Sequence, residues 1–123
     1  MSTAAIKRGE GESCVFVAPT GGVTIHLPVL IGNVVVIPME TKAQTLNFQG
    51  AIEGVWECDA SGSDTIAAGD LLSWDHTNAV FRRSLSFTEL TGDLNGCAIA
   101  VAPKAGSATR VWAKLCPGSG NVV

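Results

Sequence analysis

Glycine and proline interrupt this chain so often that no long helix can form in it. The 123 residues include 14 glycines and five prolines. No long window repeats apolar side chains at helical spacing without a break. Short apolar and β-branched runs lie between the interruptions, as in sandwiches and small barrels. The sequence therefore predicts an all-β protein, a small β-barrel or β-sandwich of short strands with little or no helix.

The apolar runs indicate where these strands lie. We expect strands over residues 13–18, 29–31, 33–38, 44–49, 51–58, 71–74, 79–81, 94–102 and 109–115. Residues 33–38 are apolar at almost every position, which indicates burial on both faces, whereas 44–49 alternate and should keep one face in water. Residues 75–78 predict a tight turn, and the polar stretch 83–93 predicts a loop with one helical turn over 87–90. The last two strands should form a hairpin.

Size and composition indicate one folded domain. At 123 residues and 12.7 kDa the chain has room for one core. We divide it into a flexible N-terminal arm over residues 1–12, a single β domain over 13–116 and a flexible C-terminal tail over 117–123. Only 15% of the residues are charged, against about 25% in an ordinary soluble domain. This low share is typical of a protein that covers part of its surface with copies of itself or with a partner.

The charge balance argues against a nucleic-acid partner, and the apolar pattern argues against a membrane. The formal net charge is −3, whereas a nucleic-acid binder needs a basic surplus to neutralise phosphates. No apolar run approaches the roughly 20 residues that span a bilayer, and the first residues carry no apolar signal core. We therefore expect synthesis in a reducing cytoplasm, where Cys14, Cys58, Cys97 and Cys116 stay thiols.

No residue pattern points to catalysis, a metal or a cofactor. The chain has two histidines. No motif ties His26 to Cys14 as a base–nucleophile pair, so we interpret His26 as a surface or interface residue. His76 and Asp75 are too few to bind a metal. We expect no enzyme activity, no metal and no cofactor. The open alternative is an enzyme whose site is assembled from distant residues such as Cys14, His26 and Asp70.

The three tryptophans are more informative. Trp56, Trp74 and Trp112 each lie in a predicted strand, and an indole ring favours half-buried positions. We expect these side chains in the core or at a contact with another subunit or partner.

Six landmarks follow one another along the chain. They are GESCVFVAPTGGVT at 11–24, PVLIGNVVV at 28–36, EGVWEC at 53–58, IAAGDLLSWD at 66–75, NGCAIAVA at 95–102 and ATRVWAKL at 108–115. In their order and spacing they resemble the capsid cement, or decoration, protein family of tailed phages and prophages. The resemblance covers residues 9–115. Ile25-His26-Leu27 and the stretch 83–93 depart from the family pattern.

The resemblance implies a structural viral protein on the exterior of the virion. Such a protein, made in the bacterial host cytoplasm, binds the outer surface of the capsid lattice and stabilises contacts between major capsid proteins. It also implies a homo-oligomer, with a trimer favoured over a dimer. The binding surface should be distributed. The residues we expect at capsid or subunit contacts are Lys7, Arg8, Glu10, His26, Arg82, Arg83 and Trp112.

Two other functions stay open at this point. One is a different phage structural protein, such as a tail or head–tail connector protein. The other is a small OB-like nucleic-acid-binding barrel, which should carry a basic stripe with interleaved aromatic side chains.

Overall fold

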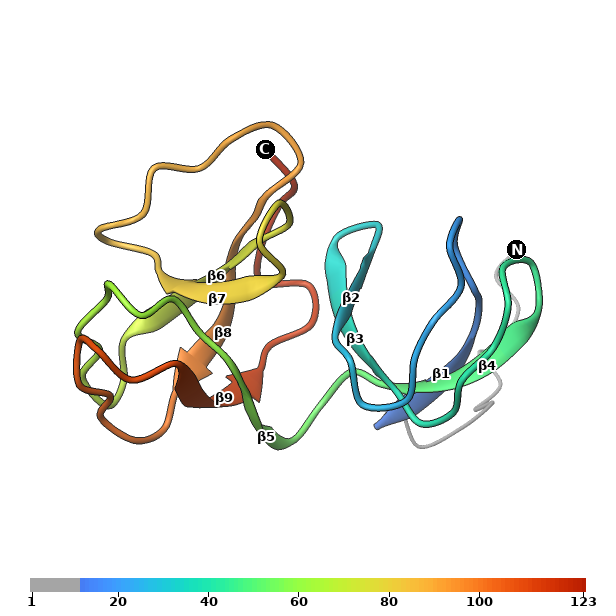
Figure 1. Ribbon diagram of the computed structural model, residues 1–123, viewed down its shortest axis with the longest axis horizontal. Helices are drawn as coiled ribbons and strands as arrows, with labels where there is room; N and C mark the ends of the chain where they lie inside the picture. Colours follow the sequence, from blue (N-terminus) through green and yellow to red (C-terminus); the bar gives the residue numbers. More distant parts are fainter. Residues whose placement is uncertain (1–11) are drawn as a thin grey trace, which may run out of the picture.

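The computed structural model describes residues 12–123 and consists of nine strands in two antiparallel sheets (Figure 1). The strands are β1 (Ser13–Val17), β2 (Val29–Ile31), β3 (Val34–Pro38), β4 (Asn47–Ala51), β5 (Val55–Asp59), β6 (Leu71–Asp75), β7 (Val80–Arg83), β8 (Leu94–Ala100) and β9 (Arg110–Leu115). No helix occurs in this part of the chain. The prediction of an all-β protein of short strands is confirmed, and of its two forms the structure has the sandwich-like one.

The chain completes one sheet before it enters the other. The first sheet has the order β1-β4-β3-β2 and the second the order β5-β9-β8-β6-β7. Figure 1 shows the crossing between them as the segment that joins β4 to β5. A single bridge between Ala60 and Phe81 brings the two edges of the second sheet together at one end. The second sheet is therefore strongly curled, but it does not close into a barrel.

Strand β3 lies between two hydrophobic clusters. Val36 packs with Phe48 inside the first sheet, whereas Val35 and Ile37 belong to the larger cluster that fills the second sheet. All three are at most 4% exposed. This explains why the run that ends at Pro38 lacks polar alternation, and it confirms the predicted burial on both faces.

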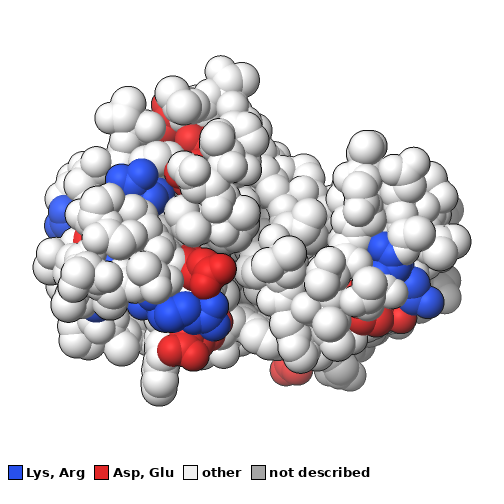
Figure 2. All heavy atoms as spheres, viewed as in Figure 1, with Lys and Arg blue, Asp and Glu red and all other residues white. Residues whose placement is uncertain are grey.

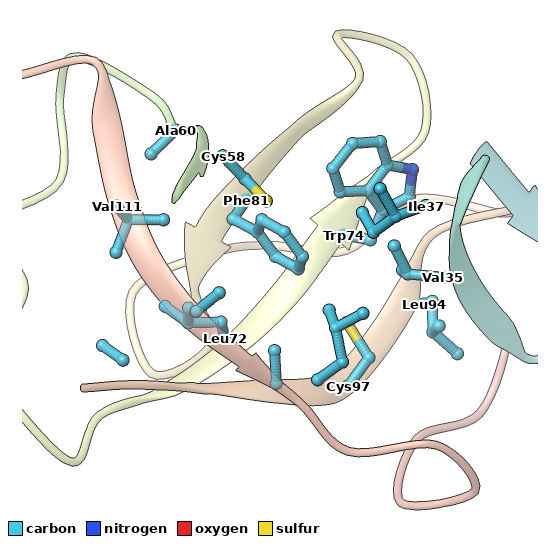
Figure 3. Packing of buried hydrophobic residues seen from close by; sticks show 14 of the residues in the cluster. Val35, Ile37, Cys58, Ala60, Leu72, Trp74, Phe81, Leu94, Cys97 and Val111 are labelled. Atoms are coloured by element: carbon cyan, nitrogen blue, oxygen red, sulfur yellow. The ribbon is translucent and has the colours of Figure 1, made fainter. Parts of the chain in front are cut away.

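The larger cluster fills the concave side of the second sheet. Trp74 and Phe81 meet edge to face with ring centroids 5.0 Å apart, and Figure 3 shows Ile37 from the first sheet beside Trp74. Each buried aromatic or aliphatic side chain of this size contributes about 1.5–3 kcal/mol to folding. One shared core thus holds the two sheets together.

Of two predicted connections, the structure confirms one and contradicts the other. The predicted turn at 75–78 is present, because the Asp75 carboxylate accepts hydrogen bonds from the amides of Thr77 and Asn78 at 3.0 and 3.2 Å. The expected helical turn over 87–90 is wrong: the chain turns at 84–86 and then runs without regular structure. The Ser73 hydroxyl holds this loop, with Ser84 at 2.7 Å and the Glu89 carboxylate at 3.2 Å.

The C-terminal tail, for which the sequence predicts a flexible end, is hydrogen-bonded to both sheets. Val122 forms a bridge with Leu94 at the start of β8, and its amide donates to the Asn33 side chain at 3.0 Å. The Val123 amide donates to the Asp93 carbonyl at 2.8 Å. The tail ends in two valines, which favour extended backbone, and it forms backbone hydrogen bonds with residues at the start of β8. The N-terminal arm lies, but for Glu12, outside the described residues, and the division into arm, domain and tail stays a prediction.

A buried ionic cluster ties two loops of the second sheet, after β5 and after β8, to strand β7. Asp64 and Lys104 are each 5% exposed. The Asp64 carboxylate accepts hydrogen bonds from the Arg82 side chain at 2.8 Å and from the Arg83 amide at 3.0 Å. The Lys104 ammonium donates to the carbonyls of Asp64, Ala105 and Gly106. Burial alone would raise the pKa of Asp64, but these hydrogen bonds and the two cations lower it below its ordinary value.

Replacement of this carboxylate should destabilise the protein. Asp64→Asn should lower the free energy of unfolding in urea by about 2–4 kcal/mol, because the part-buried Arg82 loses its anionic partner. Asp59→Asn is the matched control, since Asp59 pairs with Arg110 at 2.6 Å in an exposed position, and it should cost about 0–1 kcal/mol. Equal losses in the two variants would contradict the structural role of the Asp64 cluster.

The same carboxylate should make stability depend on acid pH. Because folding lowers its pKa, the stabilisation is complete above the ordinary pKa of about 3.9 and is lost as the pH falls through the folded value. The free energy of unfolding of the wild-type protein should decrease as the pH falls from about 4 towards 2. The decrease should be smaller in Asp64→Asn, and urea titrations at several pH values measure it. Parallel pH profiles would contradict the assignment.

Candidate functional site

The convex side of the second sheet carries an apolar surface, which we call the outer patch. It consists of one exposed apolar side chain on each of four adjacent strands, Val55, Leu71, Ile99 and Trp112, together with Val101 directly after β8. The alternation along β9 produces it, because Val111, Ala113 and Leu115 point into the core and Trp112 therefore points out.

The strand register brings the members of the outer patch together. Val55 pairs with Lys114, Lys114 with Ile99, and Ile99 with Leu71, so one row crosses four strands. In the next row, the Val101 amide donates to the Trp112 carbonyl at 2.9 Å. Each of the five patch side chains keeps between 36% and 55% of its surface exposed. Single exposed apolar residues are ordinary, but a contiguous group of this kind marks an interaction site.

The outer patch has a charged rim of mixed sign. Glu57 and Asp59 lie on β5 and Arg110 lies on β9, whereas Lys114 of β9 lies inside the patch, between Val55 and Ile99 in the row that crosses the strands. The Arg110 guanidinium donates to Asp59 at 2.6 Å, and this hydrogen bond raises the pKa of Arg110 above its ordinary value. Lys114 makes no ion pair with any residue in the range 12–123. Figure 2 shows that charged groups on the viewed face gather in small mixed clusters between large uncharged areas. No basic stripe appears on that face.

The structure places His26 beside one end of the outer patch. Its backbone is in the left-handed region with φ at 62°, and its amide donates to the Pro38 carbonyl at 2.7 Å. Its ring lies 6.4 Å from the Trp56 ring. The two rings line a pocket of about 280 Å³, which Glu57 and Arg110 of the charged rim border as well. His26 and the rim of the patch are therefore neighbours.

The two adjacent arginines at the end of β7 differ in their surroundings. Arg83 donates to Asp70 at 2.9 Å, and both line a pocket of about 430 Å³ together with Leu71 of the outer patch. Arg82 instead pairs with Asp64 and lies 4.7 Å above the Phe87 ring. Arg83 thus borders the far end of the outer patch, whereas Arg82 is held in the ionic cluster.

Among the predicted contact residues, Trp112 belongs to the outer patch, Arg83 lines a pocket with Leu71 of the patch, and His26 lines a pocket with Glu57 and Arg110 of the rim. Lys7, Arg8 and Glu10 lie outside the described residues. No local sequence pattern marks Val55, Leu71, Ile99 or Val101 as contact residues. The alternation at 109–115 is a sequence signal for an outward Trp112, but the other four join it only through strand register.

Neither the distant residues of the enzyme alternative nor a set of metal ligands gathers at one place among the described residues. The distant set weighed as an enzyme alternative does not come together: Cys14 lies on β1, His26 contacts Trp56, and Asp70 bonds Arg83 and the Ala67 amide. Between residues 12 and 123 no group of three or more metal-binding side chains converges. That part of the chain also contains no helix with the length and apolar character to cross a membrane.

Comparison with known proteins identifies the family. No curated protein and no solved structure matches the chain significantly. The family description for phage cement proteins matches residues 6–115, a range that includes every strand and the whole outer patch. Members of this family are structural proteins that associate with phage capsids. This chain belongs to the phage cement protein family.

Proposed function

We propose that this cement protein binds the outer surface of the capsid lattice through the outer patch and so stabilises contacts between major capsid proteins. The observation that carries the proposal is the outer patch itself, an apolar group of five side chains on a protein with few charges. A core of apolar side chains with a charged rim is the usual anatomy of a protein contact. In this account the protein is made in the bacterial host cytoplasm and is a structural protein without enzyme activity.

Trp112 is the residue on which the contact should depend most. It lies between Glu57 of β5 and Val101, the residue after β8, near the middle of the outer patch. Large aromatic side chains at the centre of an interface provide most of its binding energy. His26 and Arg83 border the patch and would lie at its edge.

The other predicted contact residues belong to a second, N-terminal part of the proposal. We propose that residues 1–12, with Lys7, Arg8 and Glu10, contact the capsid and that this segment orders on docking. Arg82 stays a predicted contact residue, although its guanidinium is engaged with Asp64. Capsid binding that survives deletion of residues 2–10 would exclude the arm from the contact.

Self-association would multiply a weak single contact. An oligomer that engages several capsid subunits at once gains avidity of about 100-fold to 10,000-fold over one contact. We propose a homo-oligomer and favour a trimer over a dimer, because capsid lattices offer many threefold positions.

Replacement of Trp112 should weaken capsid binding without unfolding the protein. Trp112→Ser should reduce co-sedimentation with expanded capsids by roughly 30-fold in apparent affinity, since central aromatic side chains are worth about 2 kcal/mol. The thermal midpoint should change little, because the side chain is 55% exposed. Leu46→Ser is the control, as Leu46 is 52% exposed and lies outside the outer patch. If both variants bind like the wild type, the patch is not the contact.

The stoichiometry is measured separately from capsid binding. Light scattering of the isolated protein should give the mass of a trimer, three times the chain mass of 12.7 kDa, or a whole multiple of that mass. A protein that stays a monomer at all concentrations would contradict the proposed homo-oligomer.

A further inference from the structure

Strand β1 is an edge of the first sheet, and its outward backbone groups have no partner among residues 12–123. It pairs only with β4. The Ile52 amide donates to the Glu12 carbonyl at 3.0 Å, and the Ala18 amide donates to the Leu46 carbonyl at 2.8 Å. Hydrogen-bonded and non-hydrogen-bonded pairs alternate along two antiparallel strands. These two bonds show that the amides and carbonyls of the even-numbered residues of β1 face β4. The amides and carbonyls of Ser13, Val15 and Val17 therefore face away from the sheet.

Among residues 12–123, this edge has none of the features that normally prevent strand pairing. Proteins protect open edges with charged side chains, proline or a bulge. The five residues of β1 are Ser-Cys-Val-Phe-Val, and the register of β1 with β4 runs without a shift. Val15 and Val17 are 63% and 59% exposed. The β1 edge is thus an uncharged, apolar template for another strand.

The spacing of the outward groups makes the edge complementary to itself. If two copies of β1 run antiparallel with Val15 opposite Val15, then Ser13 lies opposite Val17 on both sides of the centre. All three facing pairs are of the hydrogen-bonded type, since each of these residues directs both its amide and its carbonyl outward. No charged side chain of β1 would meet a like charge in this arrangement.

We propose that the β1 edges of two copies pair across a two-fold axis at Val15 and join the two four-stranded sheets into one continuous sheet. This contact goes beyond the proposed capsid contact and uses a different sheet. In an assembly of trimers, it would link a copy in one trimer to a copy in the next. A cement layer joined in this way would stabilise the lattice through its own contacts as well as through the capsid protein.

Cysteine cross-linking tests the register directly. In a background of Cys14→Ser and Cys116→Ser, which removes the two partly exposed thiols, Val15→Cys should form a disulfide-linked dimer when diamide accepts the two thiol hydrogens. Facing residues of a hydrogen-bonded pair have Cα atoms about 5.5 Å apart, within the range of about 4.4–6.8 Å for a disulfide. The dimer should exceed half of the protein on a non-reducing gel and disappear with a thiol reductant.

Val17→Cys in the same background is the matched control. Its exposure is almost the same as that of Val15, but its own copy lies four positions away in the proposed register, more than about 7 Å and too far to cross-link. Equal cross-linking of the two variants, or none in either, would overturn the proposal.

A backbone variant separates this contact from the capsid contact. Val15→Pro removes an outward amide and no bond to β4, and proline is tolerated on edge strands. It should abolish the linkage between copies, seen as a loss of scattering mass, and leave binding to bare capsids in place. If Val15→Pro abolishes capsid binding and leaves the mass unchanged, the edge pairs with a capsid strand and the proposal is wrong.

Discussion

The burial of β3 on both faces is the interaction on which the rest of the structure depends. Val36 faces the cluster of the first sheet, and Val35 and Ile37 face the cluster of the second. Neither sheet is large enough to bury both faces of its own strands, and short isolated sheets are marginally stable in water. By serving two cores, β3 makes the two sheets one folded unit. It also determines which surfaces remain outside.

Those outside surfaces are unusually apolar for a chain of this size. The curl of the second sheet directs Trp112 and its neighbours outward over four strands, and the first sheet ends in the open edge of β1. In a free monomer both surfaces would favour aggregation. In a capsid layer they become contacts, which agrees with the family to which the chain belongs. The low share of charged residues, visible in composition alone, corresponds in the structure to the outer patch and the apolar β1 edge.

Local sequence patterns predicted that most of the strands exist, but not where each of them begins or which strands lie beside it. Strand β2 was predicted with the bounds it has, and the hairpin of β8 and β9 is confirmed by the pairing of Ala98 with Leu115. The expected strand at 44–49 begins only at Asn47, because Thr45 adopts a left-handed backbone with φ at 71°. That conformation depends on a bond from the Thr45 amide to the Ala18 carbonyl, which no local pattern shows.

The site was predictable to a similar extent. Alternation along β9 marks Trp112 as outward. Of the two departures from the family pattern, His26 lies beside the charged rim of the outer patch, and the loop after Arg83 lies beside Leu71. The ion pair between Arg82 and Asp64 joins residues 18 positions apart. No local pattern in the sequence therefore shows that Arg82 is held inside the fold and is not free at the surface. The same holds for strand order, which decides between a barrel and a sandwich and depends on non-local pairing.

A cryo-electron microscopy map of expanded capsids with the protein bound tests the central claim most directly. The account predicts that the convex side of the β5-β9-β8-β6 surface faces the major capsid protein, with the Trp112 indole covered. A map in which this protein occupies the capsid exterior while the outer patch faces solvent in every copy would contradict it.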